Sequence, residues 1–108
     1  MHPVMAGWVR TPFHRAHKGE LSGIRPDTLV AESIKEVVSR LKLDPSDIDD
    51  VIVGCAYPEG EQGYNIGRMA SLLAGLPESV PGMTINRLCG SSMLSLIHIS
   101  EPTRLRRI

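Results

Sequence analysis

The sequence predicts an α/β protein in which parallel strands alternate with helices. The segment at residues 51–57 (VIVGCAY) is apolar on both faces, as in a buried central strand, and a further strand is expected at residues 82–88 (GMTINRL). Two amphipathic stretches, at residues 27–41 and 65–74, have apolar side chains three and four positions apart. Strands that are apolar on both faces and separated by helices are typical of parallel sheets with right-handed crossovers.

The first strand is expected at residues 4–9, where Gly7 weakens it, and a polar loop with Gly and Pro follows. The first helix is expected at about residues 27–41, and Pro26 or Asp27 suits its first positions. One face of this helix should be buried, and its apolar members are Val30, Ile34, Val37, Val38 and Leu41.

The remaining elements follow in the same order. Asp44 is expected to cap a short turn before the strand at residues 51–57. The second helix, residues 65–74, should end before Gly75 and turn five residues inward: Ile66, Met69, Ala70, Leu72 and Leu73. After the strand at residues 82–88, the segment GSSM that follows Cys89 could open a third helix. The prediction is three parallel strands in the order 3-2-1 with flanking helices.

Composition bounds the function. The chain has 108 residues, is 42% hydrophobic and 22% charged, and carries a formal net charge of zero, which suits one small domain and argues against a general nucleic-acid binder. No apolar run reaches the roughly 20 residues of a membrane span, and no signal peptide is visible. Cys55 and Cys89 form neither a disulfide framework nor a metal-ligand spacing, so we expect a reducing, cytoplasmic compartment and no metal.

Cys89 lies between the end of a strand and the start of a helix. The free N–H groups and positive dipole end of a helix favour a thiolate, and they can also donate to an oxyanion. Gly90, Ser91 and Ser92 are small enough for a substrate to approach. A buried, inert thiol is the alternative reading of Cys89, because free cysteines are usually core residues. For Cys55, in the middle of an apolar run, the inert reading is the stronger one.

The stretch TINRLCGSSM at residues 84–93 resembles the nucleophile motif of the thiolases. Three further segments match that family in order: VRTPFHRAHKGELSGIRPDTL, DVIVGCAYPEGEQGYNIGRMASLLAGLP and SVPGMTINRLCGSSM, the last containing the motif. The resemblance covers about residues 4–93 and is nearest to the acetyl-CoA acyltransferases, or 3-ketoacyl-CoA thiolases, of fatty-acid degradation. It implies a partial N-terminal domain with a thiolase-like fold.

The resemblance implies that Cys89 is the catalytic nucleophile and that coenzyme A is a substrate rather than a bound cofactor. Asn86 and Arg87, which precede Cys89, would have a structural role. Asn65 and Arg68 match a family stretch near the subunit interface, although a helix cap and a solvated charge explain them equally well. His14 and His17 are expected to be surface residues with no catalytic role, and no CoA-binding residue can be assigned.

In this family, the activating histidine, a second cysteine that acts as acid and base, the remaining oxyanion donors and most of the CoA pocket come later in the chain. A complete thiolase is two similar halves, so the fragment alone is expected to be inactive. The resemblance implies acyl-CoA and CoA as ligands, a homodimeric or homotetrameric parent, and a β-oxidation hydratase/dehydrogenase subunit as a further partner.

Residues 94–104 (LSLIHISEPTR) resemble no part of a thiolase and match the translation of a transposase-based sequencing adapter. Such an adapter continues with an index and a fixed ATC codon, which fits residues 105–108 with Ile108 last. We therefore expect a partial thiolase domain at residues 1–93 and a non-native tail at residues 94–108. The alternative is a small non-enzymatic α/β module whose basic tail, with Arg104, Arg106 and Arg107, binds a partner.

Overall fold

The computed structural model describes residues 2–101 and contains a two-stranded parallel sheet with three α-helices. In the register of the sheet, Val51 lies opposite Gly82 and Gly54 opposite Ile85. The elements in chain order are α1 (Pro26–Arg40), β1 (Val51–Gly54), α2 (Ile66–Leu73), β2 (Gly82–Ile85) and α3 (Ser91–Ser100), with single 3-10 turns at Glu20–Gly23, Pro45–Asp47 and Gly60–Gln62.

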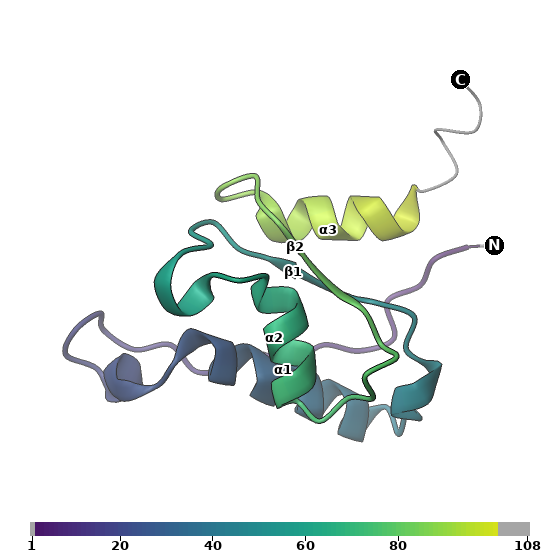
Figure 1. Ribbon diagram of the computed structural model, residues 1–108, viewed down its shortest axis with the longest axis horizontal. Coiled ribbons are helices and arrows are strands. Elements are labelled where there is room, and N and C mark those ends of the chain that lie inside the picture. Colours follow the sequence, from purple (N-terminus) through teal and green to yellow (C-terminus); the bar gives the residue numbers. More distant parts are fainter. Residues whose placement is uncertain (1, 102–108) are drawn as a thin grey trace.

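The sheet lies between helices (Figure 1). Helix α3 lies along one side of the strands, and α2 crosses the other side. Helix α1 packs mainly on α2, farther from the strands. The apolar core between these layers is small, and its buried members are Ala31, Cys55, Ile66, Ala70, Leu76 and Val80. Within the described residues, no helix is long and apolar enough to cross a membrane.

The prediction of three strands is wrong for the part of the chain that the structure describes. Strands β1 and β2 are parallel neighbours, as expected, but residues 4–9 form no strand. This segment instead runs past α1 and α3, and within residues 2–101 no backbone hydrogen bond ties it to β1. Val4 and Trp8 are 85% and 77% exposed, so packing of these side chains does not hold the segment against β1. Its backbone N–H and C=O groups can instead be satisfied by water.

The first helix and the turn after it are confirmed. Helix α1 begins at Pro26 and ends at Arg40, within one residue of the predicted bounds. The predicted apolar face of α1 is half-buried, and only Ala31 on this helix is a fully buried apolar residue. Asp44 caps the following turn, and its carboxylate accepts a hydrogen bond from the Ser46 backbone N–H at 3.0 Å.

The predicted inward face of α2 is partly wrong. Ile66 and Ala70 are buried, but Met69, Leu72 and Leu73 are 42%, 43% and 49% exposed. The reason is the close approach of α2 to β2, because a Cβ on Gly67 would lie only 2.1 Å from the Met83 carbonyl oxygen. Only small side chains fit that contact, so the buried face also includes Gly67 and Ser71. As predicted, the helix ends before Gly75, which has a φ of +79°.

The third helix is confirmed, because α3 begins at Ser91 and continues through residues 94–99 to Ser100. The residues that α3 buries are Ser91 and Ser95, whereas the apolar side chains of Leu96, Ile97 and Ile99 are 48%, 48% and 55% exposed. The apolar run at residues 94–99 therefore continues the helix while leaving much of its apolar surface exposed. Pro102 lacks a backbone N–H, so we expect regular helix to end before it, but Pro102 and the basic tail beyond it lie outside the described residues.

Candidate active site at the start of the third helix

Cys89 is exposed and lies just before the N-terminus of α3. Strand β2 ends at Ile85, and residues 86–90 form a turn that brings the chain back to the helix. Gly90 is the N-cap residue and supplies no side-chain hydrogen bond, so no capping side chain covers the start of the helix. The predicted placement between strand and helix is confirmed, with a short turn in between.

Two side chains hold this turn. The side-chain oxygen of Asn86 accepts a hydrogen bond from the Leu88 N–H at 2.8 Å. The Ser91 hydroxyl accepts from the Arg87 N–H at 2.9 Å and donates to the Leu88 carbonyl at 2.6 Å. Leu88 has a φ of +49°, a left-handed conformation that is rare for a residue other than glycine. The residue before Cys89 is therefore fixed in an unusual backbone conformation by its neighbours' side chains.

The first turn of α3 rests directly on the end of β1. A Cβ on Gly54 would lie 2.4 Å from the Ser92 backbone nitrogen and 2.7 Å from the Ser91 carbonyl carbon. Any side chain at position 54 would therefore push the helix away from the strand. The absence of a side chain at Gly54 thus allows the first turn of α3, and with it the turn that carries Cys89, to lie close to the sheet.

The second cysteine has a different environment. Cys55 directly follows β1, is 8% exposed, and donates its backbone N–H to the Ile85 carbonyl at 3.0 Å. The side-chain amide of Gln62 lies 3.6 Å from its sulfur and also donates to the Tyr57 carbonyl at 2.8 Å. The predicted burial of Cys55 is confirmed, and its chemical inertness stays a prediction.

Asn65 and Arg68 join α2 to β2 and to the loop before it. Asn65 caps α2 by accepting from the Arg68 N–H at 3.4 Å, and its amide donates to the Gly82 carbonyl at 2.9 Å. The helix-cap reading of Asn65 is therefore confirmed. The solvated-charge reading of Arg68 is wrong, because its guanidinium donates to the Val80 and Glu78 carbonyls. Neither side chain belongs to the Cys89 turn.

The predicted surface histidines, His14 and His17, are exposed in the loop before α1. Among the described residues, no cluster of three or more His, Cys, Asp or Glu side chains could hold a metal ion. The turn at residues 86–90, which contains Cys89, includes no histidine.

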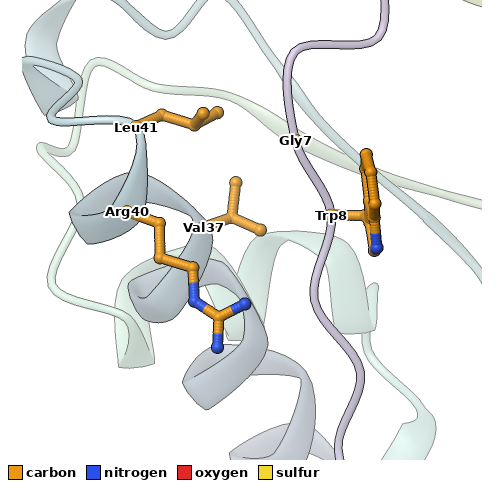
Figure 2. A pocket seen from close by; sticks show the side chains of 5 residues that line it. All are labelled: Gly7, Trp8, Val37, Arg40 and Leu41. Atoms are coloured by element: carbon orange, nitrogen blue, oxygen red, sulfur yellow. The ribbon is translucent and has the colours of Figure 1, made fainter.

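Open grooves lie at other places. Figure 2 shows one between α1 and residues 7–8, where Val37 and Arg40 project toward the extended segment while the Trp8 ring stands on its far side. A larger groove of about 680 Å³ runs along β1 between α1 and α3, and its apolar wall includes Val30, Ile34 and Leu96. Cys89 lines neither groove.

The family model described as "Thiolase, N-terminal domain" matches residues 4–105, nearly the whole chain. The chain belongs to the thiolase family. The match runs past Met93, so it does not mark the end of the thiolase-like sequence that we predicted there.

Individual thiolases agree with this assignment. The chain is 44% identical over 102 residues to a 3-ketoacyl-CoA thiolase of Bacillus subtilis, covering 94% of this chain and 26% of the relative. It is 54% identical over 89 residues to a β-ketoadipyl-CoA thiolase of Escherichia coli, covering 82% and 22%. The chain thus spans about a quarter of the length of these relatives.

A solved thiolase shows the same fold. The Acat5 thiolase of Ascaris suum, solved in complex with coenzyme A, superimposes with a TM-score of 0.73 at 31% identity. The superposition covers 82% of this chain and 23% of that one. The thiolase-like α/β fold predicted from the sequence is therefore confirmed, with two strands instead of three in the described part.

Sequence reasoning missed the parts played by Ser91 and Gly54. Ser91 was valued only for its small size, and Gly54 appeared as one residue of an apolar strand. A polar residue two positions after the cysteine, in CGSS, was the available signal for Ser91. No local pattern identifies Gly54, because its importance comes from a helix that follows 37 residues later.

Proposed function

We propose that this chain is the N-terminal part of a 3-ketoacyl-CoA thiolase and that Cys89 is the nucleophile of that enzyme. The observation that carries the proposal is the exposed Cys89 thiol at the uncapped start of α3, in a chain of the thiolase family. A helix N-terminus stabilises a thiolate, and an exposed thiol can be reached by a large substrate.

The proposed reaction is a transfer of an acyl group in two steps. The Cys89 thiolate attacks the 3-keto carbonyl carbon, and the bond between C2 and C3 breaks. The electron pair of that bond remains on C2, which takes a proton and leaves as acetyl-CoA. The thiol of a second CoA then attacks the thioester on Cys89, which releases the shortened acyl-CoA and restores the thiol. Residues that supply and accept the protons are expected later in the complete enzyme.

The names of the relatives support the choice of substrate class. Several are 3-ketoacyl-CoA thiolases, the E. coli relative is named for β-ketoadipyl-CoA, and the Ascaris thiolase was solved with coenzyme A. The names of the bacterial relatives favour a 3-ketoacyl thioester of CoA as substrate, and the Ascaris structure supports coenzyme A as a ligand. We propose that the complete protein acts on such thioesters as a homodimer or homotetramer, and we place it in fatty-acid β-oxidation in the cytoplasm, with a hydratase/dehydrogenase subunit as partner. The chain alone should be inactive.

We also propose that the thiolase sequence ends at Met93 and that residues 94–108 are a translated adapter. The outward-facing apolar side chains of Leu96, Ile97 and Ile99 are compatible with a sequence that was not selected for this place. The test is to sequence the source locus across codon 93. Continuation into a thiolase helix is the expected result, whereas codons for residues 94–108 followed by more coding sequence would contradict the proposal.

The activity is testable in a hybrid thiolase, defined here as the B. subtilis relative with its matching segment replaced by residues 4–93 of this chain. The hybrid should cleave a 3-ketoacyl-CoA, with 3-oxoadipyl-CoA assayed beside a fatty 3-ketoacyl-CoA. Cys89→Ser should abolish cleavage, because a hydroxyl is a far weaker nucleophile at neutral pH. Cys55→Ser is the matched control and should retain activity. An active Cys89→Ser hybrid would exclude Cys89 as the nucleophile.

A further inference from the structure

The turn that carries Cys89 contains a buried hydroxyl whose role goes beyond small size. Ser91 is 3% exposed, although the cysteine two residues before it is exposed. Its hydroxyl bonds to two backbone groups of the turn, the Arg87 N–H and the Leu88 carbonyl. It also lies 3.5 Å from the side-chain oxygen of Asn86, which bonds the Leu88 N–H. Both polar backbone groups of Leu88 are thus held by side chains.

The backbone conformation of Leu88 needs support from neighbouring groups. A left-handed φ of +49° is strained for a non-glycine residue, so it persists only where the surroundings enforce it. The Leu88 side chain is 60% exposed, so its packing cannot supply that enforcement. The side chains of Asn86 and Ser91 supply hydrogen bonds that can enforce it, and the bond from the Ser91 hydroxyl is part-buried and therefore partly shielded from water. The Ser91 backbone N–H also donates to the Leu88 carbonyl, at 3.2 Å, and this longer bond would remain after removal of the hydroxyl.

Ser91 also connects the turn to the sheet. It is the first residue of α3, and its carbonyl carbon lies against Gly54 of β1. The same residue thus touches the sheet with its backbone and the turn with its side chain. Cys89 lies between two residues that this arrangement fixes, Leu88 and Gly90, and the Gly90 N–H donates to the Arg87 carbonyl at 3.0 Å.

We propose that Ser91 is a positioning residue for the nucleophile: its hydroxyl holds Leu88 in the left-handed conformation and thereby presents the Cys89 thiol at the N-terminus of α3. The inference rests on the proposed function for its catalytic meaning. The geometric part concerns the thiol alone and can be tested without any thiolase activity.

The first experiment measures the rate at which iodoacetamide alkylates each cysteine of the full 108-residue chain, resolved by peptide mass spectrometry. Ser91→Ala should slow alkylation of Cys89 by about two- to fivefold, the value of an interaction with a helix terminus. Ser95→Ala is the matched control, because Ser95 is 8% exposed, lies one turn later, and donates the same kind of bond to the Ser92 carbonyl. This control should leave the Cys89 rate unchanged.

Cys55 reports on the fold in the same samples. If Ser91→Ala makes the buried Cys55 reactive, Ser91 supports the whole fold and the positioning role is overturned. An equal Cys89 rate in Ser91→Ala and Ser95→Ala would also overturn it. The double variant Leu88→Gly/Ser91→Ala should recover the Cys89 rate, because glycine adopts a left-handed φ without strain. Failure of the double variant to recover that rate would contradict the mechanism through Leu88.

The second experiment tests the catalytic meaning in the hybrid thiolase. Ser91→Ala should lower kcat for thiolysis about 100-fold with little change in KM, because a displaced nucleophile weakens the reacting geometry rather than substrate binding. Ser71→Ala is the control, since Ser71 is 1% exposed and donates to the Arg68 carbonyl, away from the turn. A hybrid whose Cys89 is never acylated would refute the proposed function, while the alkylation rates would still decide the role of Ser91.

Discussion

Two neighbouring parallel strands of this protein each lead into a cysteine, and the two thiols have opposite environments. Cys55 follows β1 directly and is buried, with the Gln62 amide next to its sulfur. Cys89 follows β2 after three intervening residues and is exposed just before the start of α3. Position at the carboxyl end of a parallel strand is therefore not enough to make a thiol accessible. The turn that follows the strand decides it.

The first prediction concerns the reactivity of the two thiols in the native chain. Cys89 should be alkylated about 100-fold faster than Cys55, which corresponds to an opening free energy of about 3 kcal/mol for the buried thiol. Site-resolved mass spectrometry after timed quenching measures both rates in one sample. Adding a denaturant should bring the two rates together. Equal rates without denaturant would mean that burial of Cys55 does not protect it.

The second prediction removes the contact between β1 and the Cys89 turn. Gly54→Ala should destabilise the chain by about 3 kcal/mol, because its Cβ would meet the backbone of Ser92 at 2.4 Å. The free energy of opening, measured by hydrogen exchange of α3 amides, should fall accordingly. Gly23→Ala is the control, since no atom lies within 4 Å of its Cβ position. A Gly54→Ala chain as stable as this control would show that α3 does not rest on β1.

The third prediction concerns the opposite face of the sheet, where Asn65 joins α2 to β2. Asn65→Ala should cost about 1–2 kcal/mol, from the lost cap and the lost bonds to the Gly82 carbonyl and the Thr84 hydroxyl. Hydrogen exchange of α2 amides measures the loss. Asp44→Ala, which removes an exposed cap from a single turn, should have the smaller effect. The alkylation rate of Cys89 should stay unchanged, and a fall in that rate would tie Asn65 to the turn.

The smallest effect is expected from pH. The Arg25 guanidinium hydrogen-bonds both carboxylate oxygens of Asp27 and lowers its pKa below the ordinary value of 3.8. The unfolded state then binds the proton more tightly, so this contribution to stability is complete above about pH 3.8 and is lost as the pH falls through the lowered pKa. Asp27→Asn and Arg25→Gln should each flatten the acid limb of thermal stability measured by circular dichroism. An unchanged acid limb in both variants would contradict the assignment.

Much of the fold was readable from the sequence, because local chemistry determines it. Helix α1, the Asp44 cap and the end of α2 at Gly75 follow from spacing, capping and glycine conformation, and all three are present. The family and the placement of Cys89 before a helix were also predicted correctly.

The errors arose where a contact distant in sequence overrides the local pattern. Met69, Leu72 and Leu73 have helical spacing, yet α2 turns Gly67 and Ser71 to the sheet because β2 is too close for larger side chains. Residues 4–9 have strand-like composition but find no backbone partner within the described residues. The part played by Ser91 depends on a backbone conformation at Leu88 that no sequence pattern indicated.

The most direct test of the account is to trap the acyl-enzyme. The hybrid thiolase is incubated with a 3-ketoacyl-CoA in the absence of free CoA, quenched in acid, digested and analysed by peptide mass spectrometry. The account predicts the mass of the shortened acyl group on the peptide that contains Cys89, with Cys55 unmodified. Addition of CoA before the quench should remove it. An acyl group on Cys55, or acetyl-CoA released with no acyl group on Cys89, would contradict the assignment.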